Sequence, residues 1–131
     1  MLNSLTPQRA LLLIAAIAFV IIAGAWAFEH YGYPPCELCL KQRYAYYLSI
    51  PLALALAALA PGQPGIARAG LYLLAVVWLG NMVFGIWHSG IEWGWWQGPT
   101  SCTGLGELSA LPDLTKPAAM CDKPALRILG L

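Results

Sequence analysis

Two cysteines separated by two residues stand at the start of an apolar segment, with an arginine close behind them. Cys36, Cys39 and Arg43 occupy positions i, i+3 and i+7 of an expected helix, so they share one face. Glu37 and Lys41, four residues apart, lie on another face in the favourable acid-before-base order. The dipole at a helix start stabilises a thiolate, and a nearby guanidinium adds to that effect. The spacing therefore predicts a reactive dithiol at one end of a helix.

The composition predicts a protein that places its apolar surface in a bilayer. The chain has 131 residues, of which 60% are hydrophobic and 10% charged, and its mean hydropathy is +0.65. A soluble domain carries roughly 25% charged residues, and a chain this small has too small a core to hide so much apolar surface. The net charge of +1 and the lack of a basic cluster give no support for a nucleic-acid partner.

Three apolar stretches predict membrane-spanning helices at about residues 10–28, 40–60 and 67–87. We therefore expect one all-α integral-membrane helical bundle over residues 1–131. A cleaved signal peptide is the alternative for the first stretch, because Ala25-Trp26-Ala27 resembles a cleavage site. The apolar run is longer than a usual signal peptide core, which favours a retained helix. Residues 124–131 start another apolar pattern, which we interpret as the beginning of a truncated fourth span.

The connecting segments at about residues 29–39 and 88–123 contain all four cysteines, the second carrying Cys102 and Cys121. Three crossings place both segments on the same side of the membrane. Basic residues occur on both sides and do not decide the orientation. Because disulfides persist in oxidising compartments, we expect both cysteine-bearing segments on the oxidising side.

Two alternatives compete with redox chemistry for these cysteines. Zinc would require about four ligands, and Cys36, Cys39, His30 and His88 are candidates. No second Cys-x-x-Cys supports that set, so no metal is expected. Purely structural disulfides are the other alternative, since closing the segment from Cys102 to Cys121 would stabilise the fold by roughly 3 kcal/mol. A Cys-x-x-Cys ring gains little from closure, which leaves the first pair unexplained.

Redox chemistry accounts for both pairs and for the membrane. A disulfide in the long loop can accept electrons from a soluble dithiol through a mixed disulfide. The pair at the helix start would then need a lipid-soluble two-electron acceptor, for which a quinone is the obvious candidate. Arg43 would donate to a quinone carbonyl, or else serve as an interfacial anchor. His88 would assist as a donor to the ring, or else pack at the interface.

The segment Cys36-Glu-Leu-Cys39-Leu-Lys-Gln42-Arg43 resembles the DsbB family of membrane thiol:quinone oxidoreductases. The stretch from His88 to Cys102 and the later Met-Cys121-Asp extend the resemblance along nearly the whole chain. The resemblance implies a four-helix bundle in the bacterial inner membrane, of which three spans are present here. It also implies a periplasmic thioredoxin-like partner, DsbA, and electron transfer to ubiquinone or menaquinone.

The resemblance also assigns roles by position. Cys36 and Cys39 match the quinone-proximal pair, and Cys102 and Cys121 match the partner-facing pair, with both pairs in the periplasm. Arg43 matches the quinone-contacting arginine. The other quinone-binding candidates are Gln42, which stands where some members have Glu, and His88.

We expect resting disulfides Cys36–Cys39 and Cys102–Cys121, with a transient Cys39–Cys102 link during turnover. Three other hypotheses remain. The first is an enzyme of the vitamin K epoxide reductase type, which would carry its Cys-x-x-Cys late in the chain. The second is a membrane protein that binds zinc or copper. The third is an inactive truncated fragment with structural disulfides.

Overall fold

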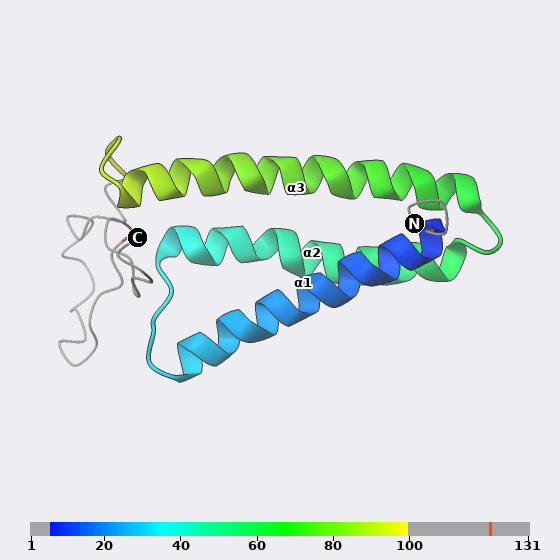
Figure 1. Ribbon diagram of the computed structural model, residues 1–131, viewed down its shortest axis with the longest axis horizontal. Coiled ribbons are helices and arrows are strands. Elements are labelled where there is room, and N and C mark those ends of the chain that lie inside the picture. The colour runs from blue at the N-terminus through cyan, green and yellow to red at the C-terminus, as the bar shows by residue number, and fades with distance from the viewer. Residues whose placement is uncertain (1–5, 100–120, 122–131) are drawn as a thin grey trace, which may run out of the picture.

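The computed structural model describes residues 6–99 and Cys121. It contains three helices, α1 (Pro7–His30), α2 (Glu37–Leu59) and α3 (Pro64–Glu92). The described residues include no strand, which confirms the prediction of an all-α protein. The helices run up, down and up, and α1 is inclined to the nearly parallel axes of α2 and α3 (Figure 1). The connection from α1 to α2 and the end of α3 therefore lie at the same end of the bundle.

Local sequence explains where the first two helices begin. The N–H of Arg9 donates to the Thr6 hydroxyl oxygen at 3.4 Å, and Pro7 occupies the first turn of α1. At the start of α2 the capping residue is Cys36, whose sulfur accepts the N–H of Cys39 at 3.1 Å. The first cysteine of the pair is thus held by the helix that it caps. The predicted pairing of Glu37 with Lys41 is confirmed, at 2.6 Å.

Helix α3 extends further than the expected span, which ended at residue 87. It continues to Glu92 and stops where Gly94 adopts a φ of 74°. The N–H of Trp95 then donates to the carbonyl of Gly90 at 2.8 Å, a common way to close a helix. His88 therefore lies on the last turns of a helix rather than in a loop, and Glu92 follows one turn later.

The centre of the bundle lies around α2, which packs against both α1 and α3. Gly70 of α3 lies so close to Leu56 of α2 that a Cβ at this glycine would overlap the leucine side chain. Small residues of this kind let helix backbones approach closely. The buried cluster that results consists of Leu11, Ala15, Ala53, Leu56, Ala57, Ala60, Ala67 and Leu74.

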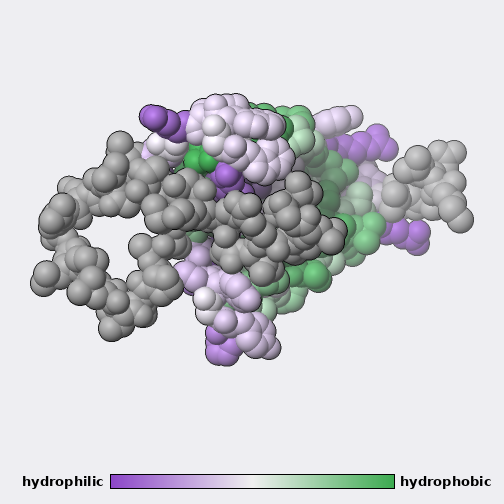
Figure 2. Space-filling view, turned by 60° about the vertical axis from the view of Figure 1, so that its left-hand side comes forward, coloured by the Kyte–Doolittle hydropathy of each residue, from purple (hydrophilic) through white to green (hydrophobic). Residues whose placement is uncertain are grey.

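The outer faces of α1 and α3 carry large apolar side chains that are exposed. These include Leu12, Leu13, Ile17, Phe19 and Val20 on α1, and Leu73, Val76, Leu79, Met82, Val83 and Ile86 on α3. Figure 2 shows such apolar surface between polar residues that gather toward the ends of the molecule. By length and composition, α1 and α3 are each able to cross a membrane. The expected span at residues 40–60, within α2, stays a prediction.

Candidate functional site

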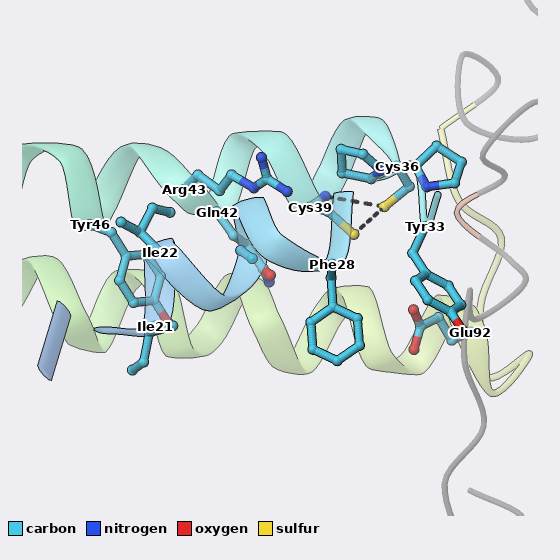
Figure 3. Close-up of a pocket in the computed structure, with 13 residues that line it drawn as sticks. Ile21, Ile22, Phe28, Tyr33, Cys36, Cys39, Gln42, Arg43, Tyr46 and Glu92 are labelled. Carbon is cyan, nitrogen blue, oxygen red and sulfur yellow. Dashed lines mark hydrogen bonds between the residues drawn. The ribbon is translucent and has the colours of Figure 1, made fainter. Parts of the chain in front are cut away.

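The two cysteines of the Cys-x-x-Cys motif lie together at the start of α2. Their sulfur atoms are 2.7 Å apart, and both residues are free thiols. Figure 3 shows this contact and the bond from the N–H of Cys39 to the sulfur of Cys36. The structure therefore presents the pair in its reduced form, whereas the sequence led us to expect a disulfide at rest.

The contact between the two sulfurs makes the thiols unequal. The hydrogen bond with Cys39 raises the pKa of Cys36, and burial raises it further. The same hydrogen bond lowers the pKa of Cys39 to about 7, although burial opposes this change. Both thiols precede residue 40, where the expected span begins. Cys39 is accordingly the thiol of the pair that ionises first, near neutral pH, while Cys36 stays protonated.

His88 contacts the same pair from the end of α3. Its Nε2 atom lies 3.4 Å from the sulfur of Cys36 and 3.7 Å from Oε1 of Glu92, one helical turn further on. Only 6% of His88 is exposed. The structure thus places His88 beside the dithiol, and its expected role as a donor to a quinone ring stays a prediction. The other histidine, His30, is exposed at the end of α1 and packs against the ring of Tyr31.

A cavity of about 360 Å³ adjoins the dithiol. The divergence of α1 from α2 toward this end is visible in Figure 1, and the cavity lies where the two separate. Its apolar walls include Ile21, Ile22, Ala25 and Phe28 of α1, together with Tyr33, Pro34 and Pro35 of the connection. Its polar lining is formed by Cys36, Cys39, Gln42, Arg43, Tyr46 and Glu92 (Figure 3).

Arg43 and Gln42 both line the cavity, on the same face of α2 as the thiols. The side chain of Arg43 is only 11% exposed, and its Nη1 donates to Oε2 of Glu29, near the end of α1, at 2.7 Å. Gln42 reaches toward Gly85 of α3. A Cβ added to this glycine would lie 3.3 Å from Nε2 of Gln42, so a larger residue at position 85 would crowd the amide. The two residues therefore contact opposite neighbours of α2, and Arg43 ties the open end of α1 to the site.

Cys121 also lies beside the first pair. It is disulfide-bonded, is 1% exposed, and shares a buried cluster with Cys36, Leu38 and Ile91. Its expected partner, Cys102, lies outside the described residues, as do the predicted Cys102–Cys121 and Cys39–Cys102 pairings. Of the four candidate catalytic cysteines, the structure brings three together.

Sequence reasoning missed two acidic residues of the site. Glu92 was expected in the connecting segment at about residues 88–123, but α3 extends far enough to place it beside His88. The two residues are four apart in the sequence, a spacing that places them on the same face of a helix. This spacing was the available signal, and it applies only if the helix is expected to continue to Glu92. Glu29 was assigned to the first loop, and nothing in its local pattern pointed to Arg43, because the two belong to different helices.

Comparison with known proteins agrees with these features. Residues 7–131 match the family model described as "Disulfide bond formation protein DsbB". An uncharacterized protein of Rickettsia prowazekii (strain Madrid E) is 26% identical over 129 residues, covering 92% of this chain and 73% of the relative. No solved structure matches the chain. Because the family model spans nearly all of the sequence, the chain belongs to the DsbB family, the membrane oxidoreductases of disulfide bond formation.

Proposed function

We propose that this protein reoxidises a periplasmic thioredoxin-like dithiol protein of the DsbA type and transfers the electrons to a membrane quinone. The observation that carries the proposal is the cavity of about 360 Å³, which both thiols line together with Arg43 and Gln42. A redox-active pair next to an apolar cavity with a few polar groups fits a lipid-soluble two-electron acceptor. Ligand cavities commonly have volumes of about 300–1,000 Å³.

The residues of this cavity suit a quinone head group, whether of ubiquinone or of menaquinone. The side chains of α1 supply apolar walls for the ring. Arg43 and Gln42 supply donors for the carbonyl oxygens, and a guanidinium favours the negative charge that develops on reduction. A quinone bound there accepts two electrons and two protons as the dithiol returns to a disulfide. Arg43 is held in place by Glu29 before any ligand arrives.

Electrons would enter through the second pair. A thiolate of the reduced partner attacks the Cys102–Cys121 disulfide, and the partner's second thiol then resolves the mixed disulfide. The partner becomes oxidised, and the loop pair becomes a dithiol. Two electrons and two protons have then moved from the partner to Cys102 and Cys121.

The next exchange would join the two pairs. Cys121 attacks Cys36 of the oxidised Cys36–Cys39 pair, and Cys39 leaves as a thiolate. Cys102 then attacks Cys121, which restores the loop disulfide and releases Cys36 as a thiol. The shared buried cluster of Cys36 and Cys121 supports this pairing, while the transient Cys39–Cys102 link that we first expected stays a prediction, because Cys102 lies outside the described residues. The lowered pKa of Cys39 makes it the better leaving group.

His88 would accept the proton of the Cys36 thiol. The thiol must lose this proton before its sulfur can close the Cys36–Cys39 disulfide, and the imidazole Nε2 lies 3.4 Å from that sulfur. Glu92 supports a protonated imidazole from the other side. In this role His88 acts on the thiol rather than on the quinone ring.

The proposal requires a fixed orientation in the bacterial inner membrane. Both cysteine pairs face the periplasm, where the partner is found, and the spans lie at about residues 10–28, 40–60 and 67–87. The end of α1, the start of α2 and the end of α3 lie at the same end of the bundle (Figure 1). This arrangement supports a location of the first cysteine pair and of the segment after α3 on one side of the membrane.

The test supplies a reduced thioredoxin-like protein and a soluble quinone analogue, and follows quinone absorbance. Loss of Cys102 or Cys121 should stop oxidation of the partner while the first pair remains oxidisable by quinone. Loss of Cys36 or Cys39 should stop quinone reduction. If the chain does not reduce quinone with all four cysteines present, the proposal fails.

A further inference from the structure

We infer that the reduced site binds one zinc ion through Cys36, Cys39 and His88, with the carboxylate of Glu92, which lies beside His88, moving in as the fourth ligand. The DsbB family assignment implies electron transfer by these cysteines, not metal binding. The inference comes from a second property of the same cluster: the ligand atoms of Cys36, Cys39 and His88 all lie within 4.8 Å of one another.

The distances are close to those of a tetrahedral zinc site. With Zn–S near 2.3 Å and Zn–N near 2.0 Å, neighbouring ligand atoms should be separated by about 3.5–3.8 Å. The sulfur of Cys36 lies 3.4 Å from Nε2 of His88, which is already close to that range. The two sulfurs, at 2.7 Å, must move apart by about 1 Å to meet it. A Cys-x-x-Cys at a helix start has the rotamer freedom for such a movement.

Glu92 supplies the fourth ligand from the cavity side. Its Oε1 atom lies 3.7 Å from Nε2 of His88, but Glu92 is outside the group whose ligand atoms all lie within 4.8 Å of one another, so its carboxylate must move toward the sulfurs to contact the ion. Glu92 and the two cysteines line the cavity, which provides a path by which an ion reaches buried ligands. Cys36 and His88 are each 6% exposed, so the ion would be largely shielded from water.

The chemistry of the donors favours zinc. Two thiolates, one imidazole and one carboxylate form a mixed S, N, O set, and Zn²⁺ accepts such ligands without a redox change. His30, which we had considered as a ligand from sequence, is exposed and lies outside the cluster of three.

Binding of this kind depends on the redox state of the pair. A Cys36–Cys39 disulfide removes two of the ligands, so only the reduced form should hold the ion. If the proposed function is correct, zinc would hold both sulfurs and so block their return to the disulfide. The ion would then act as an inhibitor that recognises the reduced enzyme.

The binding test does not depend on turnover. The full chain in detergent is reduced, freed of metal with a chelator, and titrated with Zn²⁺ in competition with a chromogenic chelator. Co²⁺ serves as a spectroscopic probe, because thiolate-to-cobalt charge transfer and tetrahedral d–d bands report the ligand set. We expect one ion per reduced chain and none at this site in the oxidised chain.

Matched variants identify the ligands. We expect His88→Ala to weaken binding roughly tenfold or more, and Glu92→Gln to weaken it less. His30→Ala and Glu37→Gln, which change residues outside the cluster, should leave the affinity unchanged. Equal affinity of His88→Ala and the parent chain, or equal binding by the oxidised protein, would overturn the inference.

A second arm separates this inference from the proposed function. If the reduced chain binds zinc with the expected ligands but never reduces quinone, the metal site stands and the proposed function fails. If quinone reduction proceeds and zinc neither binds nor inhibits, the proposed function stands and the metal site is wrong. Zinc inhibition of the parent chain, together with loss of zinc binding in His88→Ala in the titration that does not depend on turnover, would support both.

Discussion

The two ends of this bundle are built from the same three helices in contrasting ways. Near the turn between α2 and α3, small residues such as Ala53, Ala57 and Ala67 let the helices pack closely around Leu11 and Leu74. At the other end α1 diverges, and thiols, a guanidinium and carboxylates line a cavity of about 360 Å³. The closed end is held together by apolar burial, and the open end by a smaller buried cluster together with polar contacts between helices.

The contrast suggests that one end of the bundle provides stability and the other end provides the reactive site. Tight packing at one end fixes the relative positions of the helices, so the other end can keep a cavity without losing its geometry. At the open end, the Arg43–Glu29 pair and the hydrogen bond from Trp26 Nε1 to the Tyr47 hydroxyl at 3.1 Å tie α1 back to α2. Substitutions at the closed end should therefore change stability, and those at the open end should change chemistry.

The largest expected effect concerns the reactivity of Cys39. Its pKa of about 7 lies below the ordinary thiol value near 8.5, so at pH 6 it should hold roughly 30-fold more thiolate. The groups that act on it are Cys36, Arg43 and Glu92, and the hydrogen bond from Cys36 is the main cause. Because the thiolate is the reactive form, alkylation of Cys39 should rise with pH through a midpoint near 7.

This titration is best measured by mass spectrometry after brief alkylation, with a chelator present and with Cys102 and Cys121 replaced by serine. Cys36 should remain largely unmodified over the same range, because its pKa is raised. A midpoint for Cys39 at the ordinary thiol value would show that the two sulfurs do not share a proton in this way.

At the closed end, Ala67→Leu should destabilise the protein by about 2 kcal/mol, because Ala67 is fully buried and a larger side chain overpacks the core. The matched control is Ala69→Leu, the same change at an exposed position on the same helix. Thermal unfolding in detergent measures the difference. If both substitutions lower the unfolding temperature equally, close packing at this end is not what holds the helices together.

At the open end, Arg43→Lys should raise the quinone KM about tenfold, since lysine keeps the charge but lacks the planar fork of donors. The unfolding temperature should change little. Arg68→Lys, at the start of α3 and exposed, provides the control. If the quinone kinetics of Arg43→Lys are unchanged, Arg43 is not the residue that donates to the quinone carbonyl.

The features that the sequence predicted correctly are those that depend on spacing within one helix. The spacing of Cys36 and Arg43 placed both on one face, and the structure shows both lining the cavity. What it missed depends on where separate helices meet: Glu29 reaches Arg43 from α1, and the apolar wall of the cavity also comes from that helix. A contact between helices leaves no periodic signal in either one. Glu92 was missed for a different reason, because the end of α3 was set five residues too early.

Glu92 offers the test with the smallest expected effect, because we propose that it acts mainly by supporting His88, although it also lines the cavity and raises the pKa of Cys39. Its carboxylate lies 3.7 Å from the imidazole that contacts Cys36. Partly exposed charge pairs are typically worth at most about 1 kcal/mol, which corresponds to at most roughly fivefold in rate. Glu92→Gln keeps the shape of the cavity wall, so kcat should fall by up to that factor while the quinone KM stays nearly constant.

The control is Glu37→Gln, which removes a carboxylate from the same end of the bundle, but from an exposed pair with Lys41 that does not line the cavity. A general effect of charge on the cysteine end would slow both variants alike. A positioning role predicts that only Glu92→Gln loses kcat. It also predicts that the loss disappears in a His88→Gln background, where the carboxylate has no imidazole to support. If Glu92→Gln is equally slow with and without His88, Glu92 acts on the thiols or the quinone directly.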